Sequence, residues 1–171
     1  DSLRYHLCEI SPILRDKQRE QLSAMGERVA WIEKIGEAPQ CPTLFVANEF
    51  FDALPIRQFH KTVDGWAERR VGLRAGTHDQ FEFTLVPAAI NAHSDASEIG
   101  TAAPRSIKEI SLAAGAYASQ ISEFLARHRG RALIIDYGYA HACHGNTLQA
   151  VRAHRKCGVL EDIGESDLSA H

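Results

Sequence analysis

The sequence lacks any Cys-x-x-Cys pair. The four cysteines are Cys8, Cys41, Cys143 and Cys157. Their number and spacing predict reduced thiols in an intracellular protein rather than a disulfide framework. Cys8 lies inside an apolar strand pattern, so we expect it to be a buried free thiol.

The sequence also lacks any apolar run long enough to cross a membrane, and no signal peptide is recognisable at its start. Its formal net charge is -3, so it shows no basic excess of the kind that nucleic-acid binding requires. The basic run Arg152 to Lys156 is typical of a solvated face, and a docking surface for a protein partner is the alternative. With 171 residues, 44% of them hydrophobic, the chain can form one domain with a substantial core.

The first third of the chain alternates between strand and helix patterns. Tyr5–Ile10 has the pattern of a strand, and Ser11 is placed to cap a helix over about 12–24 that has a proline at its first position. Val29–Ile32 and the apolar run Thr43–Ala47 predict two further strands. This order of elements indicates an α/β fold with a parallel sheet.

A β-rich segment over about 56–110 interrupts the α/β pattern. Residues 56–62 and 66–73 flank an Asp64-Gly65 turn, which predicts a hairpin. The alternating stretch Phe81–Val86 adds a third antiparallel strand. We expect this segment to be an insertion in the α/β core.

The α/β pattern returns after the insertion. Ser111 is placed to cap an amphipathic helix that runs through Arg127, and Gly130 is expected to end it. Residues 132–135 then form an apolar strand that ends on Asp136. The last residues, 167–171, resemble the start of a helix.

Polar side chains follow the central strand at the point where it ends. Asn48 and Glu49 come directly after the apolar run, and Asp52 follows within one turn. Ligands bind at the carboxyl ends of strands in open α/β sheets, and an unpaired buried carboxylate is costly, so these residues are candidates for chemistry. If the strands are parallel, Asp136 shares their edge of the sheet. For Asp52, capping a short helix over 51–54 is an equal alternative.

A second cluster has the residue types of a zinc site but not its spacing. His141, Cys143 and His144 lie close together, with Cys157 as a distant fourth group. This spacing matches no standard zinc finger, so we interpret the segment as a polar loop and predict no metal.

Several of these features together resemble one known family. They are Glu9, Ser11, Pro12, Leu14, Arg15 and Gln18; the string Asn48 to Pro55; Ile134 to Gly138; Gly145 with Thr147 and Leu148; and Asp167 with Leu168. In this order and spacing they resemble the MidA family of S-adenosylmethionine-dependent methyltransferases. The string Asn-Glu-Phe-Phe-Asp-Ala-Leu-Pro is the most specific of them.

The resemblance implies a partial class I methyltransferase sheet, Rossmann-like, with an antiparallel β-rich insertion. It implies S-adenosylmethionine as the cofactor and arginine on a protein substrate as the acceptor, such as a subunit of respiratory complex I. The compartment would be the bacterial cytoplasm, or the mitochondrial matrix in a eukaryote. Residues 1–171 would be the central part of one methyltransferase domain, without the family's upstream cofactor loop and its downstream strands.

The resemblance also assigns roles on the cofactor side of the site. The residues are Glu9, Ile10, Trp31 and Asn48. Glu9 would accept hydrogen bonds from the ribose hydroxyls, which suits an acceptor-only group. The alternatives for Glu9 are pairing with Arg15 or Lys17, or favourable placement at a helix N-terminus. Trp31 would contact adenine, and simple core packing is the alternative.

On the acceptor side, the resemblance places Glu49, Asp52 and Asp136 at the catalytic centre. Glu49 would hold the guanidinium and stabilise its charge by position and electrostatics. Asp52 would be a second anchor. Asp136 would contact the acceptor or, alternatively, order the loop that follows it.

Two other classes of function are compatible with the sequence. The chain could belong to a binding or assembly factor that keeps the fold and methylates nothing. A nucleotide-dependent oxidoreductase is a third hypothesis, since an acid after the second strand also suits the ribose of NAD. The Asn48-Glu49 pair disfavours it.

Overall fold

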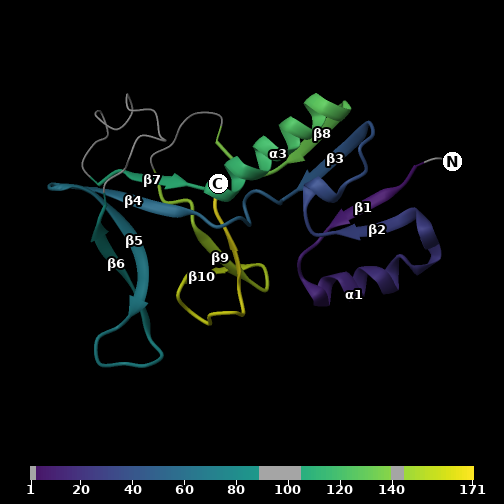
Figure 1. Ribbon diagram of the computed structural model, residues 1–171. Helices are drawn as coiled ribbons and strands as arrows, with labels where there is room; N and C mark the ends of the chain where they lie inside the picture. The colour runs from purple at the N-terminus through teal and green to yellow at the C-terminus, as the bar shows by residue number, and fades with distance from the viewer. Residues whose placement is uncertain (1–2, 89–104, 140–144) are drawn as a thin grey trace. The chain divides into compact units, whose positions relative to one another are not determined.

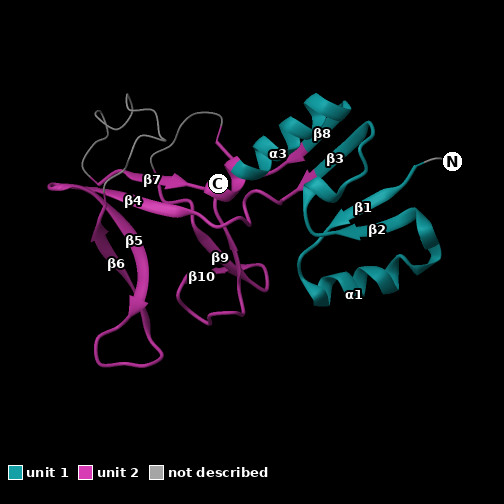
Figure 2. Cartoon of the chain, in the orientation of Figure 1, with its two compact units in different colours: residues 1–46, 116–133 teal, residues 47–115, 134–171 magenta. Residues whose placement is uncertain are grey.

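The computed structural model describes residues 3–88, 105–139 and 145–171 (Figure 1). The chain divides into two compact units (Figure 2). Unit 1 contains Asp1–Val46 and Ala116–Leu133, and unit 2 contains Ala47–Gly115 and Ile134–His171.

Unit 1 begins with a β-α-β arrangement, as predicted. Strands β1 (Tyr5–Cys8) and β2 (Val29–Ile32) pair in parallel, with Tyr5 opposite Val29. Helix α1 (Pro12–Gln21) connects them, and the Ser11 side chain accepts a hydrogen bond from the backbone of Leu14, as expected for a helix cap.

Helix α1 ends at Gln21, before the predicted end at about Ala24. The Ser23 hydroxyl donates to the Glu20 carbonyl at 2.8 Å and satisfies an acceptor of the last turn. A 3₁₀ segment, η1 (Ser23–Arg28), follows, in which Gly26 has a φ of 55° that interrupts the helical path. A second 3₁₀ turn, η2 (Ile35–Glu37), follows β2.

The prediction that Cys8 is buried is wrong. Cys8 is a free, exposed thiol. Within the described residues, its sheet has only two strands, β1 and β2, so no third strand covers the side chain.

Strands β3 (Thr43–Asn48) and β8 (Gly130–Ile135) form a second two-stranded sheet. The Thr43 N–H donates to the Arg129 carbonyl, and the Glu49 N–H donates to the Ile135 carbonyl. Both strands therefore run in the same direction and end at the same edge, which confirms their predicted parallel pairing. The expected single sheet is not observed among the described residues, because β1 and β2 form a separate sheet.

Helix α3 (Leu112–His128) confirms the predicted amphipathic helix. The Ser111 hydroxyl accepts a hydrogen bond from the Ala114 N–H at 3.1 Å and caps it. In unit 1, Ile121 and Phe124 are buried. The Phe124 ring meets that of Phe45 on β3 edge to face, with the centroids 5.2 Å apart.

Gly130 was predicted to end the helix, and this prediction is wrong. It is instead the first residue of β8. The left-handed residue after the helix is Arg129, with a φ of 66°. Gly130 has a φ of 128°, and a Cβ at this position would lie 1.9 Å from the Thr43 carbonyl oxygen. Close approach of the β3 backbone therefore requires glycine here.

Unit 2 contains the predicted antiparallel strands. Strands β4 (Arg57–Thr62), β5 (Gly65–Leu73) and β6 (Phe81–Pro87) confirm the hairpin and the third strand. A fourth strand, β7 (Ile107–Ile110), pairs with β4 and was not predicted. The strand order is β6-β5-β4-β7.

A charged cluster spans the β4-β5 hairpin. The buried carboxylate of Glu68 accepts a hydrogen bond from Arg57 at 2.6 Å and two from Arg70 at 2.6 and 2.9 Å. These hydrogen bonds, the one from Arg57 above all, lower the pKa of Glu68 to about 2.

The chain ends in a three-stranded antiparallel sheet with the order β10-β9-β11. Strands β9 (Gln149–Arg152) and β10 (Arg155–Cys157) were not predicted. Strand β11 (Asp167–Ser169) occupies the position where a helix was expected, and that prediction is wrong. The side chain of Gln149 donates to the Ser169 hydroxyl at 3.1 Å and adds to the pairing with β9.

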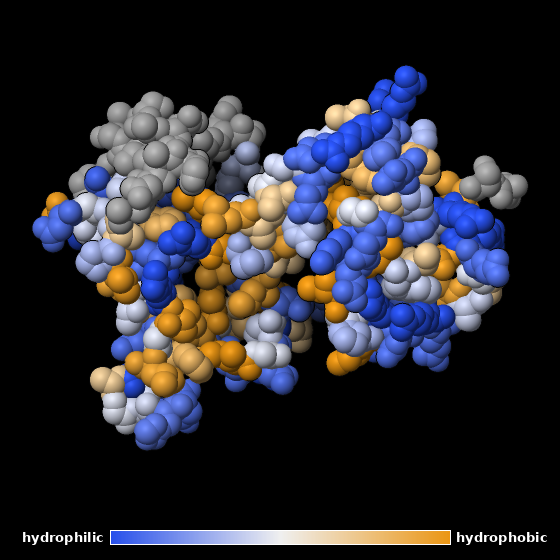
Figure 3. Space-filling model, viewed as in Figure 1, coloured by the Kyte–Doolittle hydropathy of each residue, from blue (hydrophilic) through white to orange (hydrophobic). Residues whose placement is uncertain are grey.

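The basic run at the β9-β10 turn is exposed, as predicted for a solvated face. Arg152 forms an ion pair with Asp162. Exposed apolar side chains occur on β5 and β6, including Leu73 and Leu85, and apolar residues gather over the lower part of unit 2 in Figure 3. Among the described residues, no helix has the length and apolar character needed to cross a membrane.

Candidate functional site

The end of β3 places Glu49 in an unusual backbone conformation. Its φ is 48°, in the left-handed region that non-glycine residues rarely adopt. The Glu49 N–H donates to the Ile135 carbonyl at 2.8 Å, which fixes the residue against the end of β8. Its side chain is exposed and has no hydrogen-bond or ion-pair partner in the described part of the chain. The strained backbone thus presents a free carboxylate, and such strain is found often at functional sites.

Asp136 joins the two segments that follow β3 and β8. Its Oδ2 atom accepts a hydrogen bond from the Phe51 N–H at 2.8 Å, and its Oδ1 atom accepts one from the Tyr137 N–H at 2.9 Å. Both carboxylate oxygens therefore already have a donor. Of its two predicted roles, this geometry accounts directly for ordering the loop.

Asp52 does not cap a helix. Residues 51–54 form a single turn, closed by a hydrogen bond from the Leu54 N–H to the Phe51 carbonyl at 3.2 Å. The Asp52 carbonyl accepts from the Ala170 N–H at 2.9 Å, which ties the turn to the segment after β11. The half-buried carboxylate makes no hydrogen bond within residues 3–88, 105–139 and 145–171.

A pocket of about 240 Å³ in unit 2 includes Asp52 in its wall. Tyr137 contributes to it, as do Glu109 and His171, which the sequence did not identify as site residues. The segments that line it are far apart in the sequence, so no local motif could have predicted the pocket. Asn48 lies exposed at the end of β3 and does not line it.

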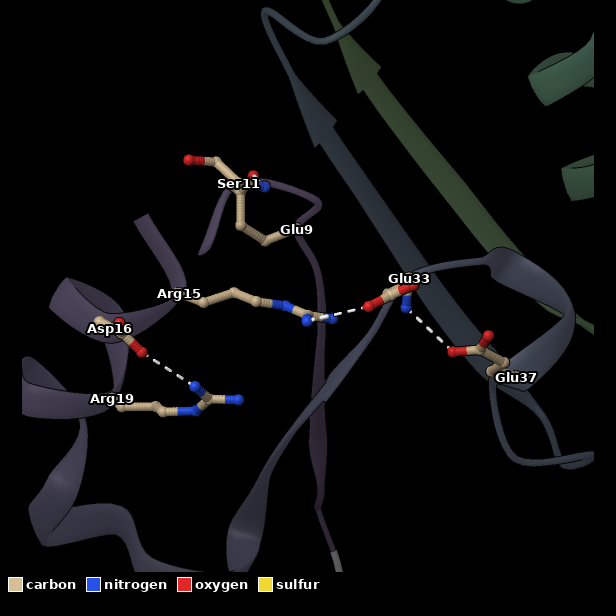
Figure 4. Close-up of polar contacts among 7 residues, drawn as sticks. All are labelled: Glu9, Ser11, Arg15, Asp16, Arg19, Glu33 and Glu37. Carbon is tan, nitrogen blue, oxygen red and sulfur yellow. Dashed lines mark hydrogen bonds and ion pairs between the residues drawn. The ribbon is translucent and has the colours of Figure 1, made fainter. Parts of the chain in front are cut away.

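In unit 1, Glu9 lies at the end of β1 beside the start of α1 (Figure 4). Its Oε1 atom accepts a hydrogen bond from the Ser11 N–H at 2.8 Å. Arg15 pairs with Glu33 instead, at 3.0 Å. The alternative in which Glu9 pairs with Arg15 or Lys17 is therefore not observed, whereas its placement at the helix N-terminus is. The other carboxylate oxygen has no hydrogen-bond partner in the described parts of the chain, which fits a group that binds ribose hydroxyls.

Trp31 and Ile10 have different surroundings. The Trp31 indole N–H donates to the Gln18 side chain at 2.9 Å, and the Arg19 guanidinium lies 5.4 Å from the ring centroid. Trp31 is half-buried against α1, which matches the packing alternative. Ile10 is exposed. Its side chain is thus accessible for contact with a ligand.

The described residues contain no group of histidine, cysteine and acidic side chains that could hold a metal ion. His141, Cys143 and His144 lie outside the described residues. Cys157 is half-buried, and its sulfur lies 3.3 Å from the Ser166 hydroxyl. This contact links Cys157 on β10 to the residue that precedes β11.

Comparison with known proteins relates the whole chain to methyltransferases. Residues 1–171 match a family described as "Putative S-adenosyl-L-methionine-dependent methyltransferase". The mitochondrial protein arginine methyltransferase NDUFAF7 of Xenopus tropicalis is 30% identical over 186 residues, which cover 96% of this chain and 42% of that protein. Its counterpart in Mus musculus is 31% identical over 163 residues, covering 93% of this chain and 36% of the relative.

Solved structures agree with this relationship. A Burkholderia thailandensis protein described as a "likely methyl transferase", bound to S-adenosyl-homocysteine, has a TM-score of 0.74 and 27% identity. The match covers 98% of this chain and 45% of that protein, so the chain spans less than half of the relatives it matches. With an α/β fold and a family match along its whole length, the chain belongs to the family of S-adenosyl-L-methionine-dependent methyltransferases.

Proposed function

We propose that the full-length protein transfers a methyl group from S-adenosylmethionine to an arginine of a protein substrate. Three observations support this: the family match, the relatives named protein arginine methyltransferase, and the structural neighbour bound to S-adenosyl-homocysteine. The cofactor supplies a sulfonium-bound methyl group, whose carbon bonds to a guanidinium nitrogen as its bond to sulfur breaks and that nitrogen releases a proton.

Glu49 is the residue that we propose for holding the guanidinium. The observation that carries this assignment is its carboxylate, which has no partner among the described residues and is held at the strand edge by a left-handed backbone. A guanidinium is always charged, and its nitrogen lone pairs are delocalised. A carboxylate at a fixed position can orient one nitrogen and stabilise the charge that becomes localised as delocalisation is lost.

The other acidic residues have supporting roles in this proposal. Asp52 is a second anchor for the substrate, because its carboxylate makes no hydrogen bond to any residue that the structure describes. Asp136 is a positioning residue, since it holds the backbone of Phe51 and Tyr137. On the cofactor side, Glu9 binds the ribose, and Ile10, Trp31 and Asn48 are proposed contacts.

The domain organisation, the substrate and the compartment are proposed from the same three observations. We propose that residues 1–171 form the central part of one Rossmann-like methyltransferase domain, with the antiparallel sheet as an insertion at about 56–110. For the substrate we propose a subunit of respiratory complex I. The compartment would be the mitochondrial matrix in a eukaryote and the cytoplasm in a bacterium.

Mass spectrometry of complex I subunits, from cells with and without the protein, tests this function. We expect a methylated arginine that disappears when the protein is absent and returns with the purified enzyme and S-adenosylmethionine. If complex I assembly fails without the protein but no arginine changes its mass, the protein is a non-catalytic assembly factor.

A further inference from the structure

The pocket of unit 2 has a lining that points to its occupant. It has a volume of about 240 Å³ and lies beside the turn after β3, with Phe51 and Asp52 on one side and Glu109 and Tyr137 among the other lining residues. Pockets for whole small ligands measure roughly 300–1,000 Å³. A single side chain therefore suits this space better than an entire cofactor.

The lining carries negative charge. Asp52 and Glu109 are its acidic lining residues, and the lining residues within the described parts of the chain include no lysine or arginine. Glu109 is fixed by hydrogen bonds from the Gln58 side chain at 2.5 Å and from the Thr147 hydroxyl at 2.5 Å. The Thr147 N–H donates to it as well, at 3.1 Å. These hydrogen bonds hold the carboxylate of Glu109 in one position.

Asp52 is the open member of this pair. Its backbone is fixed by the turn and by the hydrogen bond from Ala170, but its carboxylate has no partner in the described parts of the chain. A half-buried carboxylate without a donor is a ready acceptor for a cationic ligand group.

Two features oppose cation binding. The first is the Arg69 guanidinium, which donates to the Gln58 side chain at 3.0 Å and lies near enough to Glu109 for their charges to attract each other. The second is a helix end. The N-terminus of α3 reaches the pocket through Ser111 and Ala114, and a helix N-terminus carries about half a positive charge. The Ala114 N–H is already satisfied by the Ser111 hydroxyl at 3.1 Å. Arg69 is attracted to Glu109 but does not line the pocket, so the carboxylate of Asp52 is the charge left to attract a cation there.

The apolar part of the lining suits a side chain with an aliphatic stem. Ile56, Ala114 and Ala170 supply apolar surface, and the aromatic residues Phe51 and Tyr137 can face a cation. Arginine and lysine combine such a stem with a charged head.

We propose that this pocket accepts a basic side chain of the protein substrate that is distinct from the arginine held by Glu49. Glu49 does not line the pocket, so the two carboxylates serve separate side chains. The inference rests on the proposed function in that the substrate is a protein. It adds that sequences with a second basic residue near the methylated arginine are preferred.

Peptide binding to the full-length protein tests the pocket without any methyl transfer. The probes are fluorescent peptides with one arginine and a second residue that is lysine, arginine or the neutral norleucine, scanned through neighbouring positions. At one position we expect a basic residue to strengthen binding by about tenfold or more over norleucine, as expected for a charged hydrogen bond.

In Asp52→Asn this preference should disappear, while the norleucine peptide binds as before. Asp64→Asn, at the exposed β4-β5 turn, is the matched control and should keep the preference. Thermal unfolding checks that both variants fold.

Three results would overturn the proposal: no preference in the wild type, a preference that survives Asp52→Asn, or an equal loss of affinity for the norleucine peptide. The last would mean that Asp52 holds the acceptor arginine itself. In Glu49→Gln the preference should persist, because that residue lies outside the pocket. A preference without any arginine methylation would refute the proposed function and leave the pocket intact.

Discussion

The carboxylate of Asp136 accepts a hydrogen bond from the backbone N–H of Phe51 at 2.8 Å, across 85 positions of sequence. The same carboxylate binds the Tyr137 N–H at 2.9 Å. One side chain thereby connects the segments that follow β3 and β8, and it holds the backbone on both sides of the candidate site. This arrangement explains why an acidic residue follows β8 without requiring that residue to touch a substrate.

The first prediction concerns this connection. Asp136→Asn leaves one oxygen to accept a hydrogen bond and turns an amide donor toward the other N–H. Losing a charged hydrogen bond should lower the free energy of local opening at Phe51 and Tyr137 by about 1.5–3 kcal/mol. Amide exchange by NMR should therefore become about tenfold to a hundredfold faster at these two residues. Unchanged exchange, as expected for the control Asp64→Asn, would show that Asp136 does not order the loops.

The second prediction concerns Glu68, whose pKa is about 2 because Arg57 and Arg70 donate to its carboxylate. A carboxyl with a lowered native pKa stabilises the fold above its unfolded pKa of about 4.3. The stabilisation falls as the pH drops from there through about 2. Glu68→Gln should cost about 1–2 kcal/mol of unfolding free energy at neutral pH, since the arginines are partly exposed.

Urea unfolding of both proteins between neutral pH and pH about 3 measures the effect of Glu68→Gln. The difference in unfolding free energy should shrink steadily on the acid side. Glu82→Gln is the control, because within the described residues Glu82 pairs with Arg74 alone, at a distance of 3.9 Å. A difference that does not depend on pH would mean that packing, not charge, gives Glu68 its role.

The third prediction compares two glycines. Gly130→Ala places a Cβ against the Thr43 carbonyl at a φ of 128°, so it should cost about 3 kcal/mol or more. Gly115→Ala in α3 meets nothing within 4 Å and should stabilise by up to about 1 kcal/mol. Chemical denaturation of both variants measures these changes. Equal effects would contradict the close approach of β3 to Gly130.

The fourth prediction concerns the cofactor side. In the full-length protein, Glu9→Ala removes the carboxylate proposed to bind the ribose, so the affinity for S-adenosylmethionine should fall about tenfold to a hundredfold. Calorimetry measures the affinity, and thermal unfolding checks the effect of losing the hydrogen bond to Ser11. Glu20→Ala, on the exposed face of α1, should bind normally. Undiminished affinity would remove Glu9 from the site.

Elements with strong local signals could be predicted from the sequence. The Asp64-Gly65 pair predicted the hairpin, Ser11 and Ser111 predicted the helix starts, and the apolar runs predicted β3 and β8. The β9-β10 hairpin had no such signal: its turn residues Ala153 and His154 have positive φ values of 47° and 61°, although neither is a usual turn former.

Features that depend on distant partners could not be predicted. Asp167–Ser169 is a strand because it pairs with β9, whereas its local sequence resembles a helix start. Asp52 lines a pocket whose other lining residues include Glu109 and Tyr137. Nothing in the sequence near Asp52 indicates these neighbours, and the same holds for the exposure of Cys8.

The central claim is that Glu49 holds the arginine that receives the methyl group. Glu49→Gln keeps the size of the side chain but removes its charge. Methylation of the protein substrate by the full-length enzyme, followed by mass spectrometry, should slow by about 10²–10³-fold, as for the loss of a fixed electrostatic group. Cofactor affinity should stay the same, and Glu165→Gln, an exposed residue before β11, should methylate normally. A methylation rate equal to that of the wild type would contradict the claim.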